Sequence, residues 1–262
     1  MFKRHRATIV TSHAMALAFC CAGAGCSAAP ADDASSESAV VGTNIQLEEG
    51  RIQATDRQCT TNAKTLQLRA GAAPAETVAK INDALRAYRE RTLAEVDCTE
   101  PHTWNSAMTV VTNRGGVLSI AEAGVYGHSD AAMPQWFFLG HNYSMPSGEE
   151  LRIARMLTSQ GLAAAIRQCD ETLAAALRKS SEGNGSEPPE WGAEGACADA
   201  MDPMTGPDAV TLERAGIHVY PTSLPAPYRN VASEGIVVPW DKLPNAQRTP
   251  LGARAIRALG AP

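Results

Sequence analysis

The segment that ends at Cys26 constrains this chain most, because it predicts the compartment in which the remainder folds. Three permanent positive charges, Lys3, Arg4 and Arg6, precede the short apolar run 14–22 (AMALAFCCA), and small residues follow it. This order is typical of a cleavable export signal, and the run is shorter than the ~20 apolar residues of a transmembrane helix. We therefore predict a signal peptide over 1–25 and folding outside the cytoplasm.

Two cleavage sites compete at the end of this signal. Residues 22–24 (AGA) fit an ordinary signal peptidase, whereas 23–27 (GAGCS) are similar to a bacterial lipobox, in which Cys26 takes a palmitate-type lipid and becomes the mature N-terminus. Gly23 departs from the lipobox pattern, which usually has Leu there. The Ser/Ala/Asp-rich stretch that follows favours the lipoprotein. Ser27, by resemblance to enterobacterial sorting, favours the outer membrane, facing the periplasm or the surface.

Residues 26–44 are small, polar and acidic, which predicts a flexible tether with folded structure beginning near Ile45. The whole chain has 23 Lys+Arg and 28 Asp+Glu, a net charge of −5. Loss of three basic residues with the leader leaves 20 against 28, so the mature chain carries about −8. That surface repels phosphate backbones, so nucleic acid is not an expected partner, while a basic protein is favoured.

Four of the seven cysteines lie beyond the lipid-attachment cysteine. An even number in an oxidising compartment predicts two disulfides, with three possible pairings. We favour Cys59–Cys98 and Cys169–Cys197, because each pair brackets one predicted helix. A metal site is the alternative, but the chain has no C-x-x-C or H-x-x-x-H spacing, so we expect no metal and no other cofactor.

Hydrophobic periodicity predicts an α+β fold, with antiparallel sheets, two main helices packed on them and a short C-terminal helix. Apolar residues at spacings of three and four mark the two long helices, the first beginning at Pro74 and the second capped by Thr158 or Ser159. The expected strands lie within 45–68, 108–122, 125–126, 135–139, 151–153, 210–219 and 236–240, and the terminal helix over 250–259.

The order of these motifs resembles a two-part bacterial module. The strand region and the helix around 74–82 resemble the small domain N-terminal to peptidoglycan deacetylase domains, which places a first domain at 45–104. The remainder, 105–262, resembles its companion domain, shared with lysozyme-sensing anti-sigma factors. The motifs that carry this second likeness are 116–120 (GVLSI), 126–128 (YGH), 142–148 (NYSMPSG), 216–219 (GIHV), 225–228 (PAPY) and 235–240 (GIVVPW).

The chain also departs from these relatives. We find no transmembrane helix with a sigma-binding segment, so we do not expect an anti-sigma factor, and the metal-dependent deacetylase domain of the relatives is also missing. The family's Gly-Gly-Ala-His turn reads Gly127-His128-Ser129 here, with Tyr126 at the first glycine. What the resemblance implies is the extracytoplasmic module itself, which acts in its relatives as a receptor surface.

Candidate catalytic groups are few. Adjacent residues of one extended segment point in opposite directions, so His128, Ser129 and Asp130 do not form a hydrolase triad. The chain contains no G-x-S-x-G elbow. A metal site is a further hypothesis, in which His128 and His141 meet across a hairpin and Asp130 is the third ligand. The spacing of these residues does not require such a site. Adjacent acids such as Glu149-Glu150 are usually solvated and do not form the paired carboxylates of a glycosidase.

Trp191 is the tryptophan most expected to be exposed, because it lies in a loop rich in Pro, Gly and Glu. Trp136, with Phe137 and Phe138, is expected in the core. We take Trp191, His128 and Asp130 as possible ligand contacts.

The expected function is a non-catalytic binding or sensing lipoprotein of the cell envelope. Its ligand would be a basic, lysozyme-like protein or peptidoglycan. The alternative is a peptidoglycan hydrolase or deacetylase of a type that these motifs do not identify.

Overall fold

The computed structural model describes residues 47–56, 59–69, 73–95, 101–128, 135–184, 195–203, 207–225 and 228–261. All of them belong to one unit of the chain, Val40–Pro262. The predicted signal peptide, Cys26 and the tether lie outside the described residues. Among those residues, no helix is both long and apolar enough to cross a membrane.

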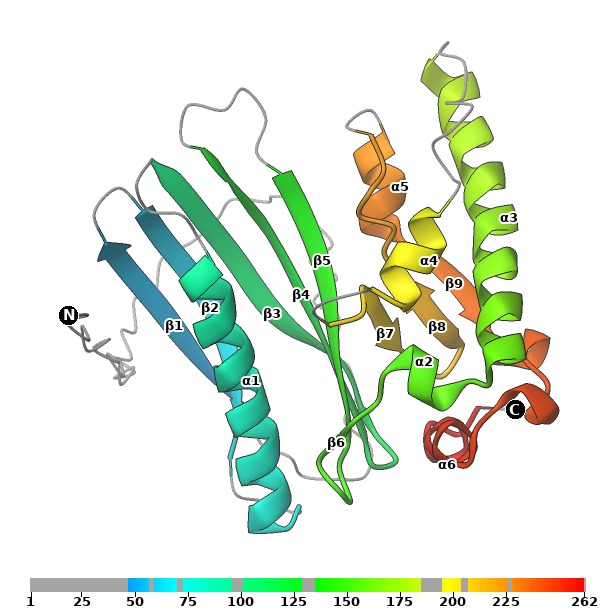
Figure 1. The fold of residues 1–262 in the computed structure, drawn as a ribbon, viewed down its shortest axis with the longest axis horizontal. Coiled ribbons are helices and arrows are strands. Elements are labelled where there is room, and N and C mark those ends of the chain that lie inside the picture. The colour runs from blue at the N-terminus through cyan, green and yellow to red at the C-terminus, as the bar shows by residue number, and fades with distance from the viewer. Residues whose placement is uncertain are drawn as a thin grey trace, which may run out of the picture. The chain divides into compact units, whose positions relative to one another are not determined.

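Six strands form one sheet in which the spatial order follows the sequence (Figure 1). All neighbouring pairs are antiparallel except β2–β3, which is parallel. The strands are β1 (Leu47–Asp56), β2 (Cys59–Leu68), β3 (His102–Arg114), β4 (Val117–His128), β5 (Gln135–Ser144) and β6 (Glu149–Glu150). The α+β class is confirmed, but the expectation of purely antiparallel sheets is wrong at this one pair.

Helix α1 (Ala75–Glu95) explains the parallel pair. Its 21 residues span about 31 Å at 1.5 Å per residue. The 10 residues of β2 span about 33 Å. The helix therefore returns the chain to the end of the sheet at which β2 began, so β3 runs in the same direction as β2. The predicted boundary between 45–104 and 105–262 falls inside β3, and both sides of it contribute strands to one sheet.

A second, smaller sheet and the remaining helices follow β6. Its three strands are antiparallel: β7 (Val210–Leu212), β8 (Gly216–Val219) and β9 (Ile236–Pro239). The helices are α2 (Ile153–Met156), α3 (Ser159–Asn184), α4 (Ala196–Met201), α5 (Arg229–Glu234) and α6 (Pro250–Ala258). Figure 1 shows α3 beside β9, on the opposite side of the small sheet from the large one.

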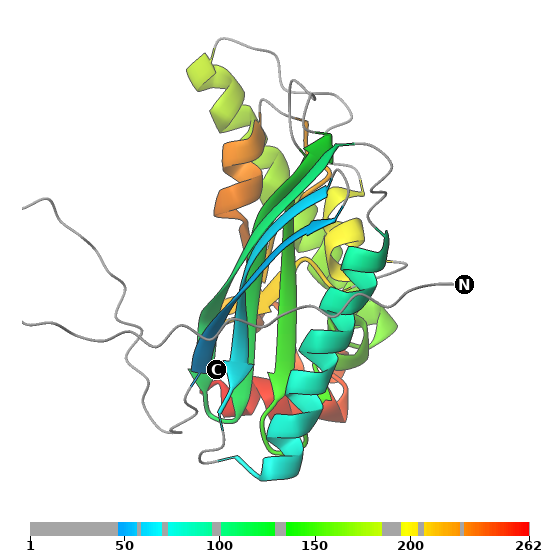
Figure 2. The ribbon, with the colours of Figure 1, turned by 90° about the vertical axis from the view of Figure 1, so that its left-hand side faces the viewer.

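Two apolar clusters hold these layers together. One joins α1 to the large sheet, where Ile81 and Leu85 are fully buried against Leu118 and Ile120. The other joins α3, α4 and α6 to the small sheet through residues such as Trp240. Figure 2 shows α1 lying across one face of the strands, with the small sheet and α3 behind them.

A buried polar junction fixes the small sheet to the reverse face of the large one. Ser119 Oγ donates to Asn142 Oδ1 at 2.5 Å and accepts from Leu212 N at 2.9 Å. Asn142 Nδ2 donates to Val210 O at 3.0 Å. Gly140 permits this approach, because a Cβ there would lie 1.5 Å from Val210 O. Every polar atom of the junction has a partner, so its burial costs little.

The structure confirms one local prediction and corrects two others, each for a physical reason. Thr158 is the N-cap of α3, since its Oγ1 accepts from Gly161 N at 3.1 Å. The strand expected at 151–153 is wrong, because Asp208 Oδ2 accepts Ile153 N at 2.7 Å, at the start of α2. Trp136 is 49% exposed instead of buried, with the guanidinium of Arg229 5.9 Å from its ring centroid.

The predicted disulfide Cys169–Cys197 is confirmed and ties α3 to α4, with the two Cα atoms 6.0 Å apart. A closed loop of 28 residues corresponds to about 3–4 kcal/mol in the loop-entropy model. Cys59 is also disulfide-bonded. Its predicted partner Cys98 lies outside the described residues, so that pairing stays a prediction.

His218 links β8 to two neighbouring segments. Its Nδ1 lies 2.8 Å from Glu213 Oε1, and its Nε2 lies 2.7 Å from Glu234 O at the end of α5. The ring stacks on Tyr220 at 4.6 Å. Both nitrogens face acceptors, which favours the doubly protonated ring. The hydrogen bond to Glu213 is the largest cause that raises the pKa of His218, against the opposing effect of burial.

This arrangement predicts a pH dependence of stability. A pKa that is higher in the folded than in the unfolded chain gives stability that is complete below the unfolded value, about 6.5, and is lost as pH rises through the folded value. The free energy of unfolding should therefore decrease over the window just above pH 6.5. Urea unfolding of the wild type and of His218→Gln should show this decrease in the wild type alone. Parallel pH profiles for the two proteins would contradict the assignment.

Candidate functional site

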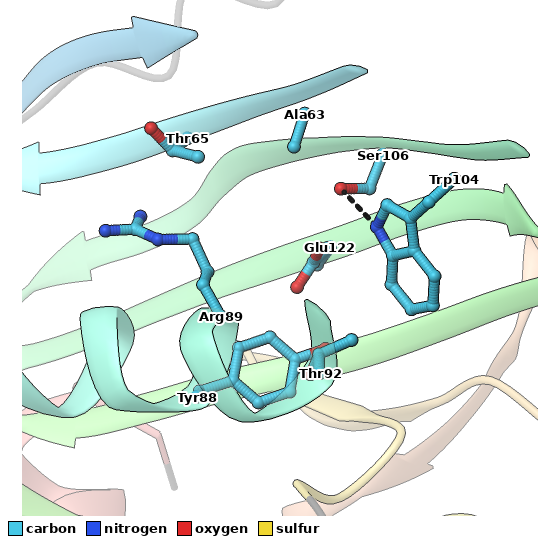
Figure 3. Close-up of a pocket in the computed structure, with 8 residues that line it drawn as sticks. All are labelled: Ala63, Thr65, Tyr88, Arg89, Thr92, Trp104, Ser106 and Glu122. Carbon is cyan, nitrogen blue, oxygen red and sulfur yellow. Dashed lines mark hydrogen bonds between the residues drawn. The ribbon is translucent and has the colours of Figure 1, made fainter. Parts of the chain in front are cut away.

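A small polar cavity lies between the C-terminal half of α1 and the large sheet. Its volume is about 20 Å³, roughly the space of one ordered water. The lining side chains come from β2, α1, β3 and β4 (Figure 3): Ala63, Thr65, Tyr88, Arg89, Thr92, Trp104, Ser106 and Glu122.

The periodicity of the elements explains why this cavity is polar. Leu118, Ile120 and Glu122 alternate along β4, so all three point to the face that α1 covers. On α1, the buried stripe of Ile81 and Leu85 continues to Tyr88. The interface is therefore apolar along the first turns of the helix and polar near its end.

Glu122 is the central charge of the cavity and is only 3% exposed. Its Oε2 accepts a hydrogen bond from His141 Nε2 on β5 at 3.1 Å. The ring of His141 meets that of Tyr88 edge-on at 4.7 Å between centroids. A carboxylate offers about four acceptor positions, and this bond uses one of them. Figure 3 places Glu122 between the α1 side chains and Trp104.

Tyr88 brings a buried hydroxyl to the cavity. The residue is 9% exposed, and its Oη makes no hydrogen bond of normal geometry, although Thr92 and Glu122 lie close enough to act on its pKa through hydrogen bonding. Burial is the main cause that raises the pKa of Tyr88 far above its ordinary value, and the negative charge of Glu122 raises it further. The phenol therefore remains protonated, and Glu122 is the acceptor near its proton.

Arg89 adds a buried donor without a partner. Its Nη1 is buried and has no hydrogen-bond partner. Burial lowers the pKa of the guanidinium, and the nearby carboxylate of Glu122 opposes that decrease. An arginine stays charged in a protein, so the cavity holds one positive and one negative group.

Aromatic rings from three strands form a wall at the end of the cavity, which we call the aromatic wall: Trp104, Tyr126 and Phe137. The Trp104 ring lies 5.7 Å from Tyr126 and 4.6 Å from Phe137, between centroids. Trp104 Nε1 donates weakly to Ser106 Oγ at 3.4 Å. Gly124 makes room for this packing, because a Cβ there would lie 2.5 Å from the Phe137 ring. Tyr126 is 39% exposed, so the wall reaches the surface.

These groups define what the cavity can do chemically. It offers two donors, one carboxylate and an aromatic surface, which suits the binding of a small uncharged polar group. Glu122 is the one carboxylate among the lining residues that the structure describes, whereas glycosidases use two. Within the described part of the chain, no cluster of three His, Cys, Asp or Glu side chains is arranged to hold a metal ion.

The residues predicted from sequence lie elsewhere or outside the described residues. His128 is in register with His102 on β3, while His141 is in register with Ile120. Eight residues of β4, about 26 Å, separate those positions, so the two histidines do not meet as a metal pair. Asp130 and Trp191 are outside the described residues, as is the His128 side chain.

Sequence reasoning missed Tyr88, Arg89 and Glu122 as a group. One signal was present: Glu122 continues the alternation of Leu118 and Ile120 at a position that should face the core. A charged residue at such a position is almost never fully buried unless it has a partner. The partner, His141, is 19 residues away in sequence and depends on the register of β4 with β5.

Two solved structures are similar to this chain. No family model and no curated protein matches the chain. A DUF3298 family protein from Pseudomonas aeruginosa PAO1 is 16% identical, with a TM-score of 0.48 over 79% of this chain and 95% of that one. A DUF3298 member from Bacteroides fragilis NCTC 9343 is 10% identical, with a TM-score of 0.43 over 81% and 97%. Both represent a domain of unknown function, and we draw no functional argument from them.

The unpartnered hydroxyl of Tyr88 predicts an unusual mutational effect. Tyr88→Phe keeps the ring and removes a buried hydroxyl whose contacts with Glu122 and Thr92 fall short of normal hydrogen bonds, so the free energy of unfolding should be unchanged or higher by about 1 kcal/mol. Glu122→Leu leaves His141 without its acceptor and should lose about 1–3 kcal/mol. Chemical denaturation measures both. A loss above about 1 kcal/mol in Tyr88→Phe would show that the hydroxyl has a stabilising partner.

Proposed function

We propose that this chain is an exported, lipid-anchored binding or sensing module of the cell envelope, and that the cavity beside α1 is its recognition point. One observation carries the proposal. Tyr88 Oη and Arg89 Nη1 are buried donors that make no hydrogen bond of normal geometry, in a cavity that also holds the buried carboxylate of Glu122. Leaving such a group unsatisfied costs about 1–3 kcal/mol. A ligand that accepts from both donors would recover that free energy on binding.

The envelope location rests on the sequence. The basic and apolar leader precedes Cys26, for which we propose lipid attachment and outer-membrane sorting. The disulfide between Cys169 and Cys197 agrees with an oxidising compartment. The resemblance to the extracytoplasmic module of lysozyme-sensing anti-sigma factors, and to the companion of deacetylase domains, points to the same place and is an argument by analogy.

Of the two ligand classes expected from sequence, the cavity favours wall glycan. Sugars combine hydroxyl and amide groups with apolar ring faces, and the aromatic wall stands beside the polar cavity. The acidic charge of the mature chain favours the second class, a basic protein such as a lysozyme-like enzyme. That attraction is long-range and unspecific, whereas the cavity offers a defined set of donors and an acceptor.

The catalytic alternative is a peptidoglycan hydrolase or deacetylase. The described cavity offers a single carboxylate, already bonded to His141, in place of an acid and a base. Turnover of purified peptidoglycan that is lost on mutation of His128 or Asp130 would establish the alternative and overturn the binding proposal.

Binding to peptidoglycan tests the proposal. The mature protein without its lipid should co-sediment with purified sacculi, and Arg89→Met should weaken binding roughly 10- to 100-fold, since a bond to a charged group contributes roughly 1.5–3 kcal/mol. Arg86→Met is the matched control on the same helix, because Arg86 is exposed and pairs with Asp83. Sedimentation that is absent in the wild type, or equal in wild type and Arg89→Met, contradicts the glycan site. Binding of lysozyme at low salt without binding to sacculi would identify a protein receptor instead.

A further inference from the structure

His218 on β8 connects the small sheet to the end of α5, outside the cavity beside α1. We infer that His218 is a proton-controlled latch: the charged ring holds the carbonyl of Glu234 at the end of α5, and the neutral ring releases it. The attachment of this short helix then depends on the pH of the compartment. The inference uses none of the cavity residues and goes beyond the proposed binding function.

Both nitrogens of the His218 ring face oxygen acceptors. Nδ1 lies 2.8 Å from Glu213 Oε1, and Nε2 lies 2.7 Å from Glu234 O. An ionised carboxylate and a backbone carbonyl only accept hydrogen bonds, so each contact needs an N–H from the ring. The doubly protonated ring supplies both. A neutral ring has one N–H and must give up one of the two contacts.

The relative strength of the two contacts determines which one is lost. A hydrogen bond to a charged acceptor is roughly twice as strong as one between neutral groups. The neutral ring therefore keeps its proton on Nδ1, where Glu213 accepts it, and turns the lone pair of Nε2 toward Glu234 O. Tyr220 Oη, at 3.4 Å from Nδ1, competes weakly with the carboxylate for that nitrogen. Loss of the proton thus breaks the bond to α5.

Gly235, which follows α5, allows the ring to come this close. Its φ is +69°, a conformation that side chains disfavour, and a Cβ there would lie 2.5 Å from His218 Nε2. On its other side the ring stacks on Tyr220, with 4.6 Å between centroids. The ring is therefore held in position on β8 while the end of α5 approaches it.

The groups around His218 favour its charged form. The hydrogen bond to Glu213 is the largest cause that raises the pKa of His218, against the opposing effect of burial. Burial raises the pKa of Tyr220, so its hydroxyl stays neutral. Thr211 and Val237, directly opposite on β7 and β9, carry no charge. The latch is therefore closed below about pH 6.5, the ordinary histidine value, and opens as pH rises through the higher pKa of the bonded ring.

Helix α5 is sensitive to the loss of one contact because it has only six residues. Helices of this length are not stable by themselves in water. Arg229, in its first turn, lies with its guanidinium 5.9 Å from the ring centroid of the exposed Trp136. Opening of the latch therefore also loosens the contact between α5 and this tryptophan.

Hydrogen exchange of backbone amides, followed by NMR, tests the latch in the mature protein without its lipid. The reporter is Gly235 N, which donates to Val231 O at 3.0 Å. Its protection, corrected for the intrinsic effect of pH on exchange, should fall about two- to tenfold as pH rises above about 6.5, the value of one hydrogen bond. Low concentrations of urea should not change this exchange, because it follows a local opening and not global unfolding.

Two variants separate the latch from a general effect of pH. In Glu213→Gln the new amide can donate to Nδ1, so the neutral ring keeps Nε2–H for Glu234 O and the protection of Gly235 should stay high at high pH. The ¹⁵N shifts of His218 should report a proton on Nδ1 in the neutral wild type and on Nε2 in Glu213→Gln. His102→Gln, a change on the large sheet, is the matched control and should leave the fall in protection unchanged.

Four outcomes overturn the inference. These are protection of Gly235 that does not change with pH in the wild type, an equal fall in wild type and Glu213→Gln, exchange that depends on urea as steeply as global unfolding, and a proton on Nε2 in the neutral wild type. The test does not depend on a ligand. Failure to bind sacculi would therefore contradict the proposed function and leave the latch standing.

Discussion

The packing of α1 across β3, β4 and β5 determines where this sheet face is apolar and where it is polar. The helix and the strands share one buried stripe, and the stripe changes character at Glu122 and Tyr88. Below that level, Ile81 and Leu85 make the contacts that stabilise the fold. Above it, a carboxylate, a guanidinium and a phenol are held by the same scaffold with part of their hydrogen-bonding capacity unused. The contacts that stabilise the fold and the groups that we propose for recognition therefore lie at different levels of a single helix–sheet interface.

The reverse face of the sheet holds the strands of the site in register. Ser119 is three positions from Glu122 on β4, and Asn142 is next to His141 on β5. These two residues bond to each other and to β7. Asp208 adds bonds to Arg152 and to Ile153 N. Because both anchors are buried and fully bonded, β4 and β5 have little freedom to shift. The hydrogen bonds on the reverse face of the sheet thus hold the Glu122–His141 contact in place without a ligand.

Local sequence patterns predicted the elements better than their assembly. Thr158 marks the start of α3, and the loop around Gly216 separates two short strands, both as expected. Helix caps and turns are predictable because they depend on residues that are close together in the sequence. The parallel β2–β3 pair depends on how a helix crosses the sheet, and the exposure of Trp136 depends on what covers each face. Neither can be inferred from a short stretch of sequence. The site is harder still, because it combines α1 with β3, β4 and the β5 partner of Glu122. The sequence showed only that Glu122 carries a charge at a position of β4 that should face the core.

The central claim is that the unused donors of Tyr88 and Arg89 serve a ligand. Its most direct test is the denaturation midpoint of the mature protein with and without soluble peptidoglycan fragments, compared between the wild type and Arg89→Met. A ligand that binds only the folded chain raises the free energy of unfolding by RT ln(1 + [L]/Kd), so the rise grows with the logarithm of the affinity. We expect a clear rise in the wild type and, at saturating ligand, a rise smaller by at least about 1.4 kcal/mol in Arg89→Met, the value of a tenfold loss of affinity. An equal rise in both proteins, or none in the wild type, would contradict it.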